Sequence, residues 1–269
     1  MLEMPVFRRW KRLVYDAATA LAPSDEDLKR LEVLFQLFAD HRCRRTDVAY
    51  DGLRDWLENA EREFDRIEFA AVVASSNPRS HAAVLTSDQL HSGSARWAVA
   101  NGVSPERTPQ AIARALHGII CNSRQLHLID PHFGPENARH RRVLEALIET
   151  LSNAGARPAL IRVHCEAKST LDHFENSATQ MARRIPSGYA IEFVRWRQRT
   201  GGDLLHNRFV LTELGGALFG VGLDDGKPGE TDDVILLTKE MYERRWAQFV
   251  DPGDGFDCAD KPATLLGNR

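Results

Sequence analysis

One short stretch of the chain carries side chains at a spacing that suits phosphate chemistry. His206 is followed two residues later by Arg208, and Glu213 and Gly220 follow at successive intervals of five and seven residues. Residues two apart on a β-strand project from the same face, so the sequence predicts that the His206 imidazole stands beside the Arg208 guanidinium. A guanidinium can hold two phosphate oxygens, and an imidazole can act as a nucleophile without a metal ion. A glycine in a second short strand, such as Gly220, allows close approach to the backbone.

This pattern resembles the phospholipase D superfamily signature, His-x-Lys-x4-Asp-x6-Gly-Ser. The spacing agrees, but Arg208 replaces Lys, Glu213 replaces Asp and Val221 replaces Ser. The resemblance implies that His206, Arg208 and Glu213 are catalytic. His206 would form a phosphohistidine, Arg208 would neutralise phosphate oxygens together with Gly220, and Glu213 would tune the chemistry. Arg at this position preserves phosphate binding, because a guanidinium can hold phosphate oxygens. It leaves catalysis open, because Arg cannot donate a proton at neutral pH.

An upstream segment, Ile129-Asp130-Pro131-His132-Phe133, extends the resemblance, which covers about residues 108–250. Asp130 and His132 follow a predicted strand at the end where ligands bind in open α/β sheets. Asp130 would orient His206 or act as a second acid. The alternative is that Asp130 caps the turn before Pro131.

A basic segment supplies a second candidate phosphate contact. Arg195, Arg197 and Arg199 alternate along a predicted strand and therefore share one face, with Trp196 on the other. We expect Arg195 and Arg197 to grip a phosphodiester backbone. A solvated strand edge, kept from pairing by its charges, is the alternative.

The elements that position these residues predict an α/β fold: a phospholipase D-like mixed sheet flanked by helices, with a mainly helical N-terminal region. We predict a mainly helical region at 1–107, a phospholipase D-like domain at 108–250 and a flexible tail at 251–269. Alternating strands and helices follow Thr108, which caps a helix with Pro109 at its first position. The predicted strands cover 126–131, 159–164, 189–196, 206–212, 217–222 and 234–237, and the helices between and after them cover 135–154, 170–184 and 239–249.

The N-terminal region carries helical patterns. Ser24 and Asp27 resemble a capping box before an apolar stripe, and a further helix is predicted over 46–64. Residues 6–14 form an amphipathic segment rich in Arg and Lys. We expect this segment to dock on the core, with attachment to a membrane surface as the alternative.

Composition limits the class of protein. The net charge of −3 excludes a protein that coats nucleic acid over its whole surface. Four widely spaced cysteines without a Cys-x-x-Cys pair favour a reducing, cytoplasmic setting and argue against a zinc knuckle. We expect no metal and no cofactor.

The leading functional hypothesis is a metal-independent phosphodiesterase, a nuclease, working as a homodimer because only one convincing motif copy is present. Defence against foreign DNA is one role for such an enzyme. The first alternative is a non-catalytic phosphate-recognition module for nucleic acid or a phospholipid headgroup. The second is a structural subunit of a larger complex.

Overall fold

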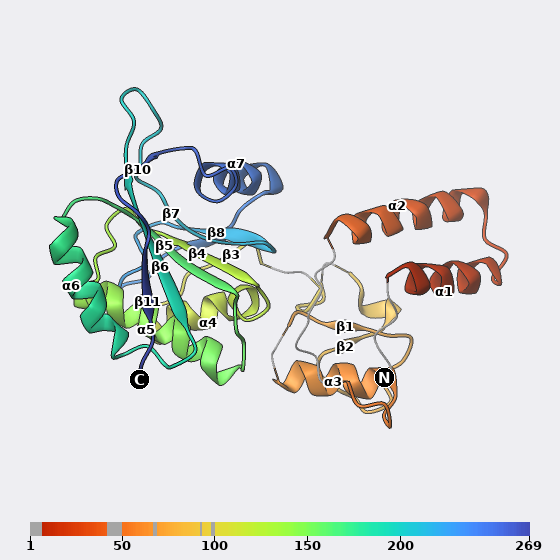
Figure 1. The fold of residues 1–269 in the computed structure, drawn as a ribbon. Helices are drawn as coiled ribbons and strands as arrows, with labels where there is room; N and C mark the ends of the chain where they lie inside the picture. The colour runs from red at the N-terminus through yellow and green to blue at the C-terminus, as the bar shows by residue number, and fades with distance from the viewer. Residues whose placement is uncertain (1–6, 42–49, 67–68, 92, 98–99) are drawn as a thin grey trace. The chain divides into compact units, whose positions relative to one another are not determined.

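The computed structural model describes residues 7–41, 50–66, 69–91, 93–97 and 100–269, and the chain forms two compact units (Figure 1). One unit comprises Met1–Arg66 with Val72–Thr86, and the other comprises Ile67–Ala71 with Ser87–Arg269. The division therefore lies nearer residue 86 than the predicted residue 107. The reason is that β3 (Gly102–Val103) pairs with a strand of the large sheet.

The first unit contains α1 (Phe7–Thr19), α2 (Asp25–His41), α3 (Trp56–Arg66) and the parallel pair β1 (Val72–Val73) and β2 (Val84–Leu85). The predicted capping box opens α2. The Ser24 Oγ accepts the Asp27 N–H at 3.2 Å, and the Asp27 carboxylate accepts the Ser24 N–H at 3.2 Å. The helix predicted over 46–64 begins only at Trp56, and residues 46–49 lie outside the described residues. No residue of α1 is buried, so the structure does not show the expected docking of α1 into a core.

The second unit is built on a mixed sheet with the strand order β10-β6-β5-β4-β7-β8-β9-β3. Strands β4, β5 and β6 are parallel, and the remaining pairs are antiparallel. The predicted class, a mixed α/β sheet flanked by helices, is confirmed (Figure 1). The strands are β4 (Gln125–Ile129), β5 (Leu160–Glu166), β6 (Ala190–Arg197), β7 (Arg208–Thr212), β8 (Gly215–Phe219), β9 (Val234–Leu236) and β10 (Asp257–Cys258).

Helices cover both faces of this sheet. The helices α4 (Pro109–Ile120), α5 (Ala138–Asn153) and α6 (Leu171–Ala182) supply the larger apolar core, and α7 (Lys239–Phe249) supplies the smaller one. Alternation along each strand decides which face a side chain joins. Leu128 of β4 lies in the larger core, whereas its neighbour Ile129 lies in the smaller core. Thr108 caps α4 as predicted, because its Oγ1 accepts the Ala111 N–H at 3.3 Å.

The predicted flexible tail is wrong. The strand β11 (Ala263–Leu266) pairs antiparallel with β6, and β10 pairs with the end of the same strand. Phe256 is 2% exposed and Leu265 is 7% exposed, so this segment closes part of both cores. The Gly, Asp and Pro residues of this segment are typical of a loop, and its two short strands form by pairing with the free edge of β6.

None of the helices described in the structure is long and apolar enough to cross a membrane.

Candidate functional site

Strand direction gathers polar residues from three separate segments at one edge of the sheet. β4 runs parallel to β5 and antiparallel to β7, and Ile129 lies opposite both His164 and Phe209. The carboxyl ends of β4 and β5 therefore meet the beginning of β7. Residues 130–132, 166–168 and 208 share this edge, although up to 78 residues separate them in the sequence.

Asp130 is the buried centre of this edge, with 2% exposure. Its Oδ1 accepts the His132 N–H at 2.8 Å, and its Oδ2 accepts the Leu223 N–H at 2.9 Å. The Arg208 Nε lies 3.9 Å from Oδ1 and has no hydrogen-bond partner among the described residues. Asp130 thus caps the turn, which is one of the two roles that the sequence predicted for it. Its carboxylate also faces Arg208. Among the described residues, no hydrogen bond or ion pair joins Asp130 to His206.

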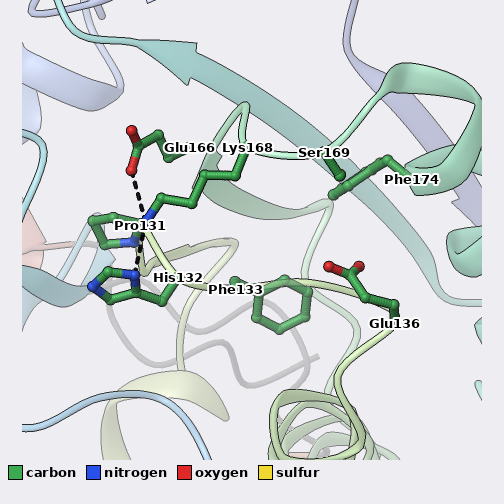
Figure 2. Close-up of a pocket in the computed structure, with 8 residues that line it drawn as sticks. All are labelled: Pro131, His132, Phe133, Glu136, Glu166, Lys168, Ser169 and Phe174. Carbon is green, nitrogen blue, oxygen red and sulfur yellow. Dashed lines mark hydrogen bonds and ion pairs between the residues drawn. The ribbon is translucent and has the colours of Figure 1, made fainter.

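His132 and Lys168 form a pair that sequence reasoning missed. The Lys168 Nζ lies 2.9 Å from the His132 Nδ1 and 2.9 Å from a Glu166 carboxylate oxygen (Figure 2). Burial, followed by the positive charges of Lys168 and Arg208, lowers the pKa of His132 below its ordinary value. The imidazole is therefore neutral at pH 7. Because an ammonium group can only donate, Nδ1 accepts and the ring proton resides on Nε2.

A cavity of about 180 Å³ adjoins this pair. Figure 2 shows the Lys168 side chain reaching from beside Glu166 towards His132, with Phe133 and Glu136 on the other side. Pro131, Ser169 and Phe174 complete its lining. The rule that singled out Asp130 and His132 also applies to the neighbouring parallel strand. Lys168 follows β5 as His132 follows β4, and this position was the signal that could have found it.

His206 is exposed and lies two residues before β7, although the sequence predicted a strand that begins at His206. Because β7 begins at Arg208, no common strand face holds His206 beside Arg208. Among the described residues, no hydrogen bond involves the His206 ring. His206 and Arg208 are near each other along the chain, but the structure fixes only Arg208 within the cluster.

Glu213 lies at the opposite edge of the sheet. β7 ends at Thr212, and its five residues span about 16 Å between the two edges. The Glu213 carboxylate accepts the N–H groups of Arg124 and Gln125 at 2.5 and 2.9 Å. It therefore secures the chain where β4 begins, and the structure does not bring it to Arg208.

Gly220 is approached closely, as its glycine identity indicates, but by a carboxylate of the protein itself. A Cβ at Gly220 would lie 3.0 Å from the Asp232 Oδ1. The Asp232 carboxylate accepts the N–H groups of Val221 and Gly222 at 2.9 and 3.2 Å, and the Gly220 N–H donates to the Asp233 carbonyl. These backbone donors are thus occupied within the protein.

The prediction that Arg195 lies on an open phosphate-binding face is wrong. Arg195 is 3% exposed, its Nη1 donates to the Asp260 carboxylate at 2.9 Å, and its guanidinium lies 4.9 Å from the centre of the Phe174 ring. The pleat of β6 directs this side chain under α6, where an internal carboxylate compensates its charge. Arg197 is exposed at the end of β6 and stays a candidate contact.

A second histidine pair lies inside the sheet, between β4, β5 and α7. The His127 Nδ1 lies 3.1 Å from the His164 Nε2, and the Trp196 indole N–H donates to the His164 Nδ1 at 3.1 Å. His164 must therefore carry its proton on Nε2 and donate it to His127. Burial lowers the pKa of His127 to about 4 and lowers that of His164 as well. This buried pair holds the sheet to its covering aromatic side chains.

Within the part of the chain that the structure describes, no three His, Cys, Asp or Glu side chains are grouped to hold a metal ion. The acidic loop after β8 instead pairs internally. Asp224 contacts both Arg107 and Arg139, and Asp225 contacts Arg142.

No protein-family model and no curated protein matches the chain. Among solved structures, the chain is similar to one described as the crystal structure of a phospholipase D family member, Nuc from Salmonella typhimurium. The match has a TM-score of 0.36 and 8% sequence identity, and it covers 60% of this chain and 98% of that chain. Similarity at this level does not carry an activity from one protein to the other.

Proposed function

We propose that the sheet edge around Asp130 binds a phosphodiester, and that the protein is a metal-independent phosphodiesterase that cleaves nucleic acid through a histidine nucleophile. The observation that carries this proposal is the contact of Lys168 with a neutral His132 beside a cavity, with Arg208 close enough for its charge to act on His132. Two cations can neutralise phosphate oxygens without a metal ion, and a neutral imidazole can transfer a proton.

The ion pair between Lys168 and Glu166 is compatible with phosphate binding. The two side chains are 52% and 37% exposed, and an ion pair this exposed contributes about 0–1 kcal/mol to stability. A phosphate group can therefore replace the Glu166 carboxylate at little cost. Arg208 faces the Asp130 carboxylate at 3.9 Å, and its Nε has no hydrogen-bond partner among the described residues.

The residues divide the chemistry as follows. The His206 imidazole attacks phosphorus, so that a P–N bond forms while the P–O bond to the leaving group breaks. The leaving oxygen takes the Nε2 proton of His132, and Lys168 returns a proton to the His132 Nδ1 across their 2.9 Å contact. Water then attacks phosphorus, so that a P–O bond forms while the P–N bond to His206 breaks, and the proton of the water returns through His132 to Lys168. Glu213 has no part in these steps, and a homodimer would supply a second copy of His206.

A second candidate function is phosphate recognition without turnover. One observation favours it: the cations are assembled, whereas His206 is exposed and no described residue hydrogen-bonds its ring to set its tautomer. Such a module would bind nucleic acid or a phospholipid headgroup, with the protein acting alone or within a larger complex.

Cleavage of labelled single- and double-stranded DNA and RNA in EDTA separates the two functions. We expect wild type to cleave and His206→Ala to be inactive, with His173→Ala, an exposed histidine on α6, as the matched control. Cleavage that requires a metal ion, or that survives His206→Ala, would overturn the nuclease proposal. Binding by both proteins without any cleavage would establish the recognition module instead.

A further inference from the structure

The first two helices form a hairpin that is packed on one side only. The Trp10 ring lies 5.9 Å from the Phe35 ring and 5.5 Å from the Phe38 ring, so the start of α1 lies beside the end of α2. Phe35 is 1% exposed, but α1 has no buried residue. Two antiparallel helices alone cannot bury an apolar face as wide as that of α2.

The uncovered apolar side chains lie beside the contact between the helices. Leu13 of α1 is 54% exposed, and Leu34 and Leu37 of α2 are 42% and 51% exposed. For antiparallel helices that meet through Trp10 and Phe35, the helical period places Leu13 and Leu34 on the same side of the hairpin, with Leu37 next to Leu34. Large apolar side chains gathered on one face indicate a surface that binds a partner.

The hairpin carries opposite charges at its two ends. The start of α1 is basic and the start of α2 is acidic, and the antiparallel arrangement places these starts at opposite ends. The basic end contains Arg8, Arg9 and Lys11, and the acidic end contains Asp25, Glu26 and Asp27. Arg12 and Asp16 lie one turn apart in the middle of α1 and pair with each other at 3.7 Å. Arg30 pairs with Glu26 at 2.6 Å and Lys29 lies in the same turn, so Asp25, Glu26 and Asp27 leave this end with an excess of one negative charge.

We propose that this apolar face binds the same face of a second copy of the chain, forming an antiparallel four-helix bundle. A two-fold axis perpendicular to the helices would bury Leu13, Leu34 and Leu37 of both copies. It would also place the basic end of each hairpin against the acidic end of the other. An anionic membrane would attract one end and repel the other, so charge favours the second copy. The proposal does not depend on phosphodiesterase activity.

Size-exclusion chromatography with light scattering on the full chain tests this surface. We expect a dimer, and we expect Leu34→Glu with Leu37→Glu to raise the dissociation constant at least about tenfold. Both side chains are half exposed, so circular dichroism of the variant should match wild type. Met241→Glu is the matched control, because Met241 is a 43% exposed helical residue in the other unit, and this variant should stay dimeric.

Charge reversal tests the antiparallel orientation. Arg8→Glu with Arg9→Glu makes both ends acidic, and Asp25→Lys with Glu26→Lys makes both ends basic. Each double variant should dimerise more weakly than wild type at low salt, and a mixture of the two should recover a heterodimer.

Three results would overturn the proposal: a monomer at every concentration, a dimer unaffected by the two leucine substitutions, or no recovery on mixing the charge variants. Phosphatidylcholine vesicles containing phosphatidylserine provide the remaining arm. Binding to these vesicles by a monomeric wild type, lost in the leucine variant, would assign the face to a membrane and contradict the dimer.

Discussion

The strands β4 and β5 position two different pairs of side chains, one within the strands and one just beyond their carboxyl ends. Within the strands, His127 and His164 form the buried pair. Beyond β4 and β5, His132 and Lys168 form an open pair beside a cavity. Burial lowers the pKa of the imidazoles in both pairs, but only the open pair has charged neighbours that a ligand can engage. A histidine with a shifted pKa therefore marks a candidate site only when solvent reaches it and charged side chains lie beside it.

The largest effect on activity should come from removing either of the two cations at the candidate site, Lys168 or Arg208. Arg208→Ala and Lys168→Ala should each lower kcat/KM for phosphodiester cleavage at least about 100-fold, because each removes a charge that stabilises the transition state. Arg208→Lys should recover only part of the loss, since the bidentate geometry is gone. The control is Lys227→Ala, an exposed lysine in the loop after β8. Equal activity in Lys168→Ala and the control would show that Lys168 takes no part in the reaction.

Substitution in the buried pair should act on stability alone. His164→Phe removes the acceptor of the Trp196 indole and the donor to His127, leaving two buried polar groups unsatisfied. The expected loss is about 3 kcal/mol of unfolding free energy. Urea denaturation measures this loss, and kcat of the remaining folded protein should equal that of wild type. A variant that stays fully stable but loses activity would reverse the roles of the two pairs.

The buried pair should also make stability depend on pH. The pKa of His127 falls from 6.5 unfolded to about 4 folded, so the unfolded state binds more protons between these values. Its contribution is fully present above pH 6.5 and is lost as the pH falls towards 4, by at most about 3 kcal/mol. Urea denaturation at a series of pH values should show this slope, and His127→Phe should reduce it, leaving the part that comes from the lowered pKa of His164. An unchanged slope in that variant would place its origin elsewhere.

The smallest effect should follow from Glu213. Glu213→Gln weakens two hydrogen bonds at the opposite edge of the sheet and should cost about 1 kcal/mol of stability. Activity measured well below the unfolding temperature should stay within about twofold of wild type. A tenfold or larger loss of kcat without a change in stability would show that Glu213 acts in the chemistry after all.

Local patterns predicted most of the sheet unit and its class. The capping of α4 by Thr108, the order of strands and helices from 125 to 249, and the capping box at Ser24 all depend on neighbouring residues, which a sequence displays directly. The pairing of β11 with β6 depends on a sheet edge far away in the chain, so the tail looked flexible.

The candidate site was predicted in part. Asp130 and His132 were found from their position after a strand, and Arg208 from its spacing to His206. Lys168 was missed because only the register of β4 with β5 brings it to His132. The spacing from Arg208 to Glu213 wrongly predicted that these two side chains lie together. β7 separates them, because Arg208 begins the strand and Glu213 follows its other end.

The most direct test of the central claim is to trap the covalent intermediate. Wild type would be mixed with phosphorus-labelled DNA or RNA in EDTA, quenched during turnover, and mapped by mass spectrometry. We expect an acid-labile phosphoramidate on His206 that is absent from His206→Ala and reduced in Lys168→Ala. Cleavage with no adduct on His206 would contradict it.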